Sequence, residues 1–246
     1  MLNPRDRLIV ALDVSSAAAA RKIVAAVGDS VSTFKVGMQL YTAEGPTLVR
    51  ELVGSGRRVF LDLKYHDIPN TVAAAVKEAA GLGVSMLTVH ACGGDTMLRA
   101  ATAVTRQFKP SLLVLAVSVL TSFDESDLTG IGIGTSVEDQ VLRLSKMALQ
   151  AGCGGVVASA REAAILRKKL GDNFALVTPG VRPRGTAHND QARVVTPAQA
   201  IGAGASHIVV GRPITEAADP TQAAQEILRE IGGAVSSQFP VASSLA

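Results

Sequence analysis

Three ionisable residues of alternating charge, Asp62, Lys64 and Asp67, stand where an apolar run should give way to a helix. The preceding residues 59–61 are Val, Phe and Leu, which predicts a buried strand ending at this point. Because side chains alternate along a strand, Asp62 and Lys64 should point to the same side of the sheet. Burying a carboxylate and an ammonium together costs free energy unless each charge is compensated. The pattern therefore indicates a site of chemistry.

Further charges lie on the two preceding predicted strands, the first of which ends in Asp13 while the second carries Lys35. Opposite charges about 4 Å apart attract by roughly 4 kcal/mol at an effective dielectric constant of about 20. Taken singly, Asp13 and Asp67 could each cap a helix, and Lys35 could extend to the surface. Together, the two lysines and two carboxylates on three neighbouring strand ends favour a catalytic array instead; they are Asp13, Lys35, Asp62 and Lys64. For His66 and His90 we expect packing or hydrogen bonding, since neither has a metal-ligand partner at the usual spacing.

A second polar group follows the predicted seventh and eighth strands. Arg182, Arg184 and Arg212 offer guanidinium groups there, Gln191 offers a neutral donor, and Gly180, Gly185, Gly211 and the Pro-rich residues from Pro179 offer accessible backbone. Barrels commonly bind phosphate at this place, so we expect a phosphate site with residues 182–191 as a mobile lid. A solvated polar loop is the alternative. It suits Arg184 and His188, but not Arg212, which directly follows an apolar run.

Short β-rich runs alternate eight times with longer helical patterns. The expected strands are Leu8–Val14, Thr33–Met38, Arg58–Lys64, Met86–Ala91, Leu112–Leu120, Gly155–Ser159, Ala175–Gly180 and Ile208–Gly211. The expected helices are Ser16–Val27, Gly45–Ser55, Pro69–Gly81, Asp95–Phe108, Val137–Ala151, Arg161–Leu170, Pro197–Gly202 and Pro220–Ile231. This order predicts a (β/α)8 TIM barrel of the α/β class. An open doubly wound sheet is the runner-up, but residues 13–15 are not a Gly-rich dinucleotide turn.

The chain of 246 residues is 48% hydrophobic and 18% charged, with a net charge of +3. We expect one catalytic domain over residues 1–231 and an uncharged tail with little structure of its own over 232–246, with an irregular connection at 122–135. No basic run suggests a nucleic-acid surface, and no apolar run is long enough to cross a membrane. Cys92 and Cys153 lack CxxC partners and are expected to be reduced, so we expect a cytoplasmic protein.

The run of residues 62–71, Asp-x-Lys-x-x-Asp-Ile-Pro-x-Thr, resembles the signature of the orotidine 5′-phosphate decarboxylase family. The resemblance covers nearly the whole chain. It includes Val10–Asp13, Phe34–Gly37, Thr88–Ala91, Leu120–Ser122, Thr178–Arg182, Gln191 and Val210–Ile214. The D-x-K match alone is shared with other sugar-phosphate barrels, whereas the extended set is specific to this family.

The resemblance implies decarboxylation of orotidine 5′-phosphate to uridine 5′-phosphate, the last step of UMP synthesis, without metal or cofactor. Lys64 would donate the proton to C6, and Asp62 would lie against the departing carboxylate. Lys35 and Asp13 would hold the ribose hydroxyls. Asp67 and Thr71 would act in the neighbouring subunit's site of a homodimer. Thr121, Ser122 and Pro179 would contact the pyrimidine, and Arg182, Gln191, Gly211 and Arg212 the phosphate.

Two alternatives stay open from the sequence. A related magnesium-dependent barrel could decarboxylate, cleave or epimerise a sugar phosphate, and would be recognised by its metal requirement. Alternatively, a non-catalytic nucleotide-phosphate binding protein could retain the phosphate-binding site alone. The complete set of Lys35, Asp62, Lys64 and Asp67 disfavours the binding protein, which has no need of a costly charge array.

Overall fold

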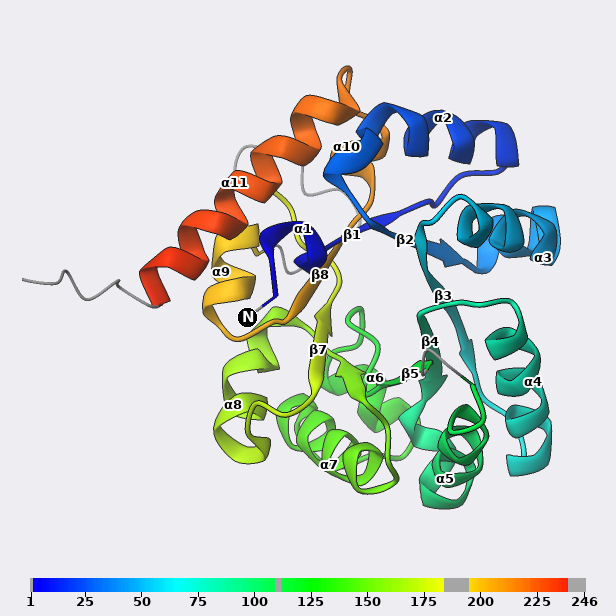
Figure 1. Cartoon of the computed structure of the whole chain (residues 1–246). Coiled ribbons are helices and arrows are strands. Elements are labelled where there is room, and N and C mark those ends of the chain that lie inside the picture. The colour runs from blue at the N-terminus through cyan, green and yellow to red at the C-terminus, as the bar shows by residue number, and fades with distance from the viewer. Residues whose placement is uncertain (1, 109–111, 184–194, 239–246) are drawn as a thin grey trace, which may run out of the picture.

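The computed structural model describes residues 2–108, 112–183 and 195–238 and shows eight parallel strands in a closed barrel, ordered β1 to β8 (Figure 1). The strands are β1 (Leu8–Ala11), β2 (Thr33–Gly37), β3 (Arg58–Tyr65), β4 (Met86–His90), β5 (Leu113–Val117), β6 (Gly155–Val157), β7 (Ala175–Thr178) and β8 (His207–Val210). Direct pairing of β1 with β8 closes the ring. The predicted TIM barrel is confirmed.

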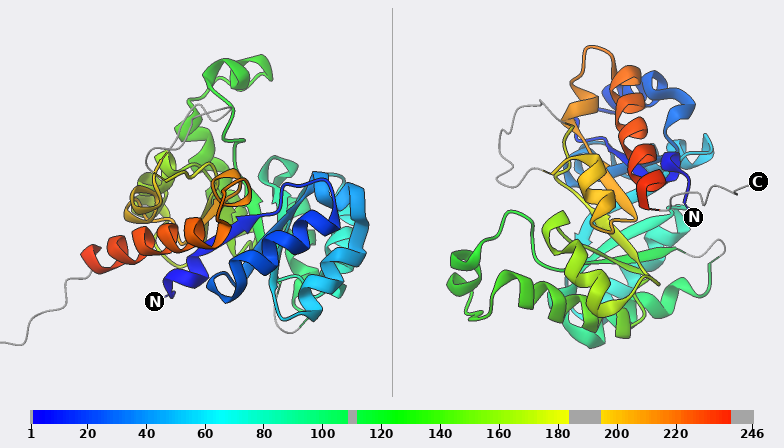
Figure 2. Two further views of the ribbon diagram at one scale, coloured as in Figure 1. Left: turned by 90° about the horizontal axis from the view of Figure 1, so that it is seen from above. Right: turned by 90° about the vertical axis from the view of Figure 1, so that its left-hand side faces the viewer.

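Helices surround the strands on the outside of the barrel (Figures 1 and 2). They are α1 (Pro4–Arg7), α2 (Ala17–Val27), α3 (Met38–Gly54), α4 (Pro69–Gly81), α5 (Gly94–Thr105), α6 (Glu125–Gly130), α7 (Val137–Gln150), α8 (Ala160–Leu170), α9 (Pro197–Gly202), α10 (Arg212–Thr215) and α11 (Pro220–Gln238), with short 3-10 turns η1 (Gly28–Ser30) and η2 (Ala91–Gly93). The hydroxyls of Ser16 and Ser136 cap the first turns of α2 and α7. Their capping satisfies amide groups that the first helical turn leaves free.

The buried apolar residues form two groups, which lie on opposite sides of the strands. The larger group joins one side of each strand to the helices. A smaller group, comprising Ile9, Ala11, Phe60, Met86, Leu115, Val177 and Val209, alternates with it along the strands and so faces the barrel axis. Asp62 follows Phe60 by two positions, and Thr88 follows Met86 in the same way. Both therefore sit above this axial core, at the carboxyl end of the barrel.

Several element boundaries differ from the predicted ones. β1 and β5 end at Ala11 and Val117, earlier than predicted. Leu12 and Val119 follow these strands and are buried and apolar, so they read like strand residues in the sequence. α3 begins at Met38 instead of Gly45, where a φ of 65° interrupts the helix and a proline follows. The connection at 122–135 contains α6, whose N-terminus is capped by a capping box between Asp124 and Asp127. Figure 2 shows α6 projecting from the body of the barrel.

The last helix crosses the boundary expected at residue 231. α11 continues to Gln238, although Gly232 and Gly233 suggest a stop. Ala234 and Val235 pack partly buried against the core, which stabilises the helix beyond the glycines. α11 lies beside α1, α2 and α9 (Figure 1). Residues 239–246 of the expected tail lie outside the described part of the chain.

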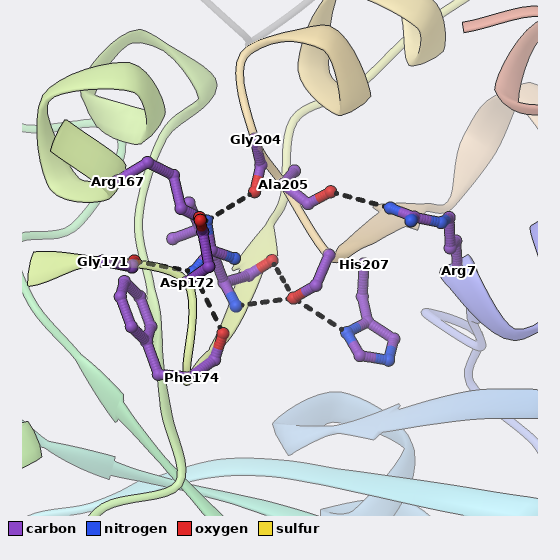
Figure 3. A network of polar contacts seen from close by, with 10 residues as sticks. Arg7, Arg167, Gly171, Asp172, Phe174, Gly204, Ala205 and His207 are labelled. Atoms are coloured by element: carbon purple, nitrogen blue, oxygen red, sulfur yellow. Dashed lines mark hydrogen bonds and ion pairs between the residues drawn. The ribbon is translucent and has the colours of Figure 1, made fainter. Parts of the chain in front are cut away.

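Arginine side chains tie helices to the amino-terminal face of the barrel (Figure 3). Arg7 donates to the carbonyl oxygen of Ala205 at 3.3 Å, and Arg167 donates to that of Gly204 at 2.9 Å while stacking 4.4 Å from the centre of the Phe174 ring. His207 begins β8 at this face, with Nδ1 3.3 Å from the Ser206 hydroxyl. Because catalytic residues of TIM barrels lie at the opposite face, we assign this network to stability.

Within the described residues, the structure contains no helix with the length and apolar character needed to cross a membrane.

Candidate active site

Four charged side chains of alternating sign meet where β1, β2 and β3 end. Lys35 Nζ lies 2.8 Å from Asp13 Oδ1 and 3.7 Å from Asp62 Oδ2, and Lys64 Nζ lies 2.9 Å from Asp62 Oδ1. The Lys35 and Asp62 side chains are only 11% and 13% exposed, whereas that of Asp13 is 54% exposed. Partial burial strengthens the attraction within this row. The structure thus brings together the four residues that the sequence placed at one mouth.

The alternative structural roles of these residues are not observed. Lys35 is buried and does not extend to the surface. Ser16 caps α2 in place of Asp13, and Ile68 occupies the N-cap position of α4 in place of Asp67. Pro69 begins α4, as the sequence predicted. Neither carboxylate is therefore explained by helix capping.

Thr88 on β4 completes the polar contacts around Asp62 and was not among the predicted site residues. Its hydroxyl donates to Asp62 Oδ1 at 2.9 Å and accepts from the Lys64 backbone N–H at 2.9 Å. Lys64 has a φ of 53°, a left-handed conformation in which the only other described residues are glycines. In the sequence, the position of Thr88 two residues after the axis-facing Met86 was the available signal.

A cavity of about 420 Å³ extends from the charge array toward the ends of β7 and β8. Its lining combines charged groups with backbone of proline and glycine. The residues are Ala11, Asp13, Lys35, Asp62, Pro179, Gly180, Arg182, Val209, Gly211, Arg212, Pro213 and Glu216. Arg182 is buried, and Arg212 begins α10, separated from β8 by Gly211 alone. Members of both predicted groups therefore line one cavity, and Glu216 adds a carboxylate that was not predicted. Lys64 is not among the lining residues and borders the cavity through its contact with Asp62.

Other predicted residues lie outside the described lining of this cavity. Asp67 and Thr71 are exposed near the start of α4, and the Asp67 carboxylate accepts from the Ile68 N–H at 2.6 Å. Thr121 and Ser122 follow β5 on the connection to α6. Gln191, with Arg184, Gly185 and His188, falls outside the residues that the structure describes, as does most of the expected lid.

Two histidines pack together beside the array. The ring centres of His66 and His90 are 5.6 Å apart, and Cys92 Sγ lies 4.0 Å from His66 Nδ1. Burial lowers the pKa of His90, and the positive charges of His66 and Lys64 lower it further. The packing role expected for the histidines agrees with this contact. Across the described ranges, no cluster of three or more His, Cys, Asp or Glu side chains is arranged to hold a metal ion.

The fold and cavity define a class: a TIM barrel with a Lys–Asp array and an arginine-containing pocket at its carboxyl-terminal mouth. Residues 6–227 match the model of the "Orotidine 5'-phosphate decarboxylase / HUMPS family". The chain belongs to this family.

The chain is similar in sequence to relatives over nearly all of their length. A protein called orotidine 5′-phosphate decarboxylase from Idiomarina loihiensis is 51% identical over 226 residues, which cover 92% of this chain and 98% of that protein. One of the same name from Rhodopseudomonas palustris (strain HaA2) is 52% identical over 94% of this chain and 96% of its own length. The crystal structure of orotidine 5′-phosphate decarboxylase from Lactobacillus acidophilus superposes with a TM-score of 0.82 at 39% identity, covering 92% of this chain and 99% of that one.

Proposed function

We propose that this chain is a carboxy-lyase that converts orotidine 5′-phosphate to uridine 5′-phosphate and carbon dioxide, the last step of UMP synthesis. The observation that carries the proposal is the alternating row Asp13, Lys35, Asp62 and Lys64 beside a cavity that holds two arginines. Family membership and the names of relatives identical at about half of their positions support the same reaction.

Lys64 is the proposed proton donor. The bond between C6 and the carboxylate breaks, its electron pair stays on C6, and carbon dioxide leaves. The Lys64 ammonium then gives its proton to C6 and regains one from solvent. Because a positive group held in a partly buried site stabilises developing negative charge, the array itself supplies the catalysis in this scheme, with no metal or cofactor. Asp62, at 2.9 Å from Lys64, holds the ammonium and faces the substrate carboxylate.

The remainder of the nucleotide binds along the cavity in this proposal. Asp13 and Lys35 hold the ribose hydroxyls, and Pro179, Thr121 and Ser122 contact the pyrimidine. Arg182, Gln191, Gly211 and Arg212 hold the phosphate through charge-assisted hydrogen bonds and close backbone contact. Binding energy gained at the phosphate, away from C6, can be used to close the site and exclude water.

We further propose a homodimer in which Asp67 and Thr71 enter the partner's site. Both are exposed in the single chain, and the Ile68 side chain between them is 67% exposed. An exposed isoleucine beside two polar residues fits a surface that becomes buried in an assembly.

A cytoplasmic location is proposed as well. Both cysteines are free thiols, and burial raises the pKa of Cys153 to about 12, which keeps that thiol unreactive. Free thiols persist in a reducing compartment.

One assay tests the reaction. Purified protein is mixed with orotidine 5′-phosphate and decarboxylation is followed by absorbance, with and without a chelator. We expect turnover that the chelator leaves unchanged and that Lys64→Ala abolishes. Activity that disappears on chelation and returns with magnesium would instead favour the sugar-phosphate enzymes of similar fold.

A further inference from the structure

The β3–β4 ladder contains an irregularity at the charge array. Leu61 pairs with Leu87, and Tyr65 pairs with Val89, so three residues of β3, 62–64, stand opposite the single residue Thr88. The extra residues form a bulge, which disrupts the ladder locally and re-aims side chains. The bulge contains both Asp62 and Lys64.

The bulge leaves the Lys64 backbone in a conformation that ordinary residues avoid. A left-handed φ such as the 53° of Lys64 costs a non-glycine residue roughly 1–2 kcal/mol. Such strain persists only where surrounding contacts enforce it. Lys64 lies within the irregular part of the β3–β4 register, and its N–H donates to the Thr88 hydroxyl.

The Thr88 hydroxyl has a fixed direction in this arrangement. The Lys64 N–H can only donate, so the hydroxyl oxygen accepts from it, and the hydroxyl proton goes to Asp62 Oδ1. The same carboxylate oxygen accepts from Lys64 Nζ. A closed loop of contacts thus links the Lys64 backbone, Thr88, the Asp62 carboxylate and the Lys64 ammonium. Thr88 is fully buried, so water does not readily substitute for it.

We propose that Thr88 is a positioning residue, whose hydroxyl holds the β3 bulge and thereby aims the Lys64 ammonium and the Asp62 carboxylate. The inference rests on the proposed function, in which these two groups act on the substrate. Thr88 acts through them and lies outside the described lining of the cavity. Loss of the Thr88 hydroxyl should therefore reduce turnover while leaving the affinity for the phosphate group unchanged.

The test compares Thr88→Val, which removes the hydroxyl at nearly constant shape, with Thr88→Ser, which keeps it. We expect Thr88→Val to lower kcat by roughly 10- to 100-fold, the range for losing a hydrogen bond to a charged group. Affinity for uridine 5′-phosphate should stay within about threefold of wild type, and Thr88→Ser should retain most of kcat. If Thr88→Val does not fold, Thr88→Ser against Thr88→Ala isolates the hydroxyl, because both lack the methyl group.

Thr33→Val is the matched control. Thr33 is a buried threonine on β2 whose hydroxyl has no hydrogen-bond partner within the described structure. Its removal should leave kcat within about twofold, since no contact is lost. Unchanged kcat in Thr88→Val, or an equal loss in the Ser variant, would overturn the proposal.

An activity-independent measurement separates this inference from the proposed reaction. Amide hydrogen exchange at Lys64, followed by NMR, should be faster in Thr88→Val than in wild type, because the N–H loses its acceptor. Equal exchange rates would show that Thr88 does not hold the bulge, whatever the enzyme's substrate. A wild-type protein inactive on orotidine 5′-phosphate with protected Lys64 exchange would instead refute the reaction alone.

Discussion

Gly37 lies so close to the Lys35 ammonium that a side chain at position 37 would displace it. A Cβ at Gly37 would stand 2.9 Å from Lys35 Nζ and 3.1 Å from Asp13 Oδ1. The backbone of Gly37, with φ −93° and ψ −178°, is open to any residue. A side chain at Gly37 would therefore displace the ends of the Lys35 and Asp13 side chains, so the absence of a Cβ here helps to hold the array in place.

Gly37→Ala should displace the Lys35 ammonium and lower kcat/KM by roughly 10- to 100-fold, because a misplacement of about 1 Å at an active site can have that effect. Thermal unfolding should change little, since the backbone conformation suits alanine. Gly54→Ala is the control, because a Cβ there meets no described atom within 4 Å. Steady-state kinetics of both variants test the expectation, which fails if Gly37→Ala matches Gly54→Ala.

The stability of the fold should depend on pH through His207. Burial, together with the nearby Arg58 and Arg7 charges, lowers the pKa of His207 to about 4. The unfolded chain binds this proton near the ordinary value of 6.5. The free energy of unfolding is therefore at its full value above pH 6.5, because neither state binds the proton there. It decreases as pH falls toward 4, by up to roughly 3 kcal/mol, because the unfolded chain takes up the proton first.

Urea unfolding of wild type and His207→Gln at pH 7.5, 5.5 and 4.5 measures this contribution. We expect the wild type to lose more free energy of unfolding than the variant over this range. Parallel losses in the two proteins would mean that His207 does not carry the dependence.

Mixing two inactive variants tests the proposed dimer. Lys64→Ala and Asp67→Ala should each be inactive alone and regain partial activity after subunit exchange. In a mixed dimer, one site would contain both an intact Lys64 and an intact Asp67, provided that Asp67 acts across the interface. Absence of recovery, after exchange has been demonstrated by mass-labelled subunits, would place Asp67 in the site of its own chain.

Arg212 should contribute to binding but not to the chemical step. Arg212→Ala should weaken uridine 5′-phosphate binding by roughly 2–3 kcal/mol, the value of a charged hydrogen-bonding contact. Calorimetry measures the loss, with Arg99→Ala as a control because Arg99 is exposed and pairs with Asp95 on α5. The reaction of a phosphate-free nucleoside should be nearly unchanged in Arg212→Ala but absent in Lys64→Ala. Equal slowing of both substrates by Arg212→Ala would contradict the phosphate assignment.

The sequence predicted most of the barrel because its strands are near-continuous apolar runs that alternate with longer helical patterns. The array was predictable for a related reason: in a closed parallel barrel, residues at successive strand ends must meet. Boundaries at Gly45 and Gly232 were less predictable, since packing decides whether a helix resumes or continues there.

The bulge in β3 was not predictable from strand alternation. Alternation places Asp62 and Lys64 on one side, and the two side chains do meet, but through a left-handed Lys64 and three residues opposite one. Thr88 was missed because its one signal, a position two residues after Met86, is informative only once Met86 is known to face the barrel axis. Its role depends on the register between β3 and β4, which brings Thr88 to Asp62 across a separation of 26 residues in the chain.

Closure of the ring by β1 and β8 also affects how the chain must be made. Leu8 pairs with Ile208 and Val10 with Val210, so β1 meets this neighbour only after about 200 further residues have been made. At about 5–20 residues per second, a ribosome leaves the β1 edge open for roughly 10 to 40 s. Unpaired strand edges are sites of aggregation. The nascent barrel is thus most vulnerable before β8 emerges, and truncation ahead of β8 would make that exposure permanent.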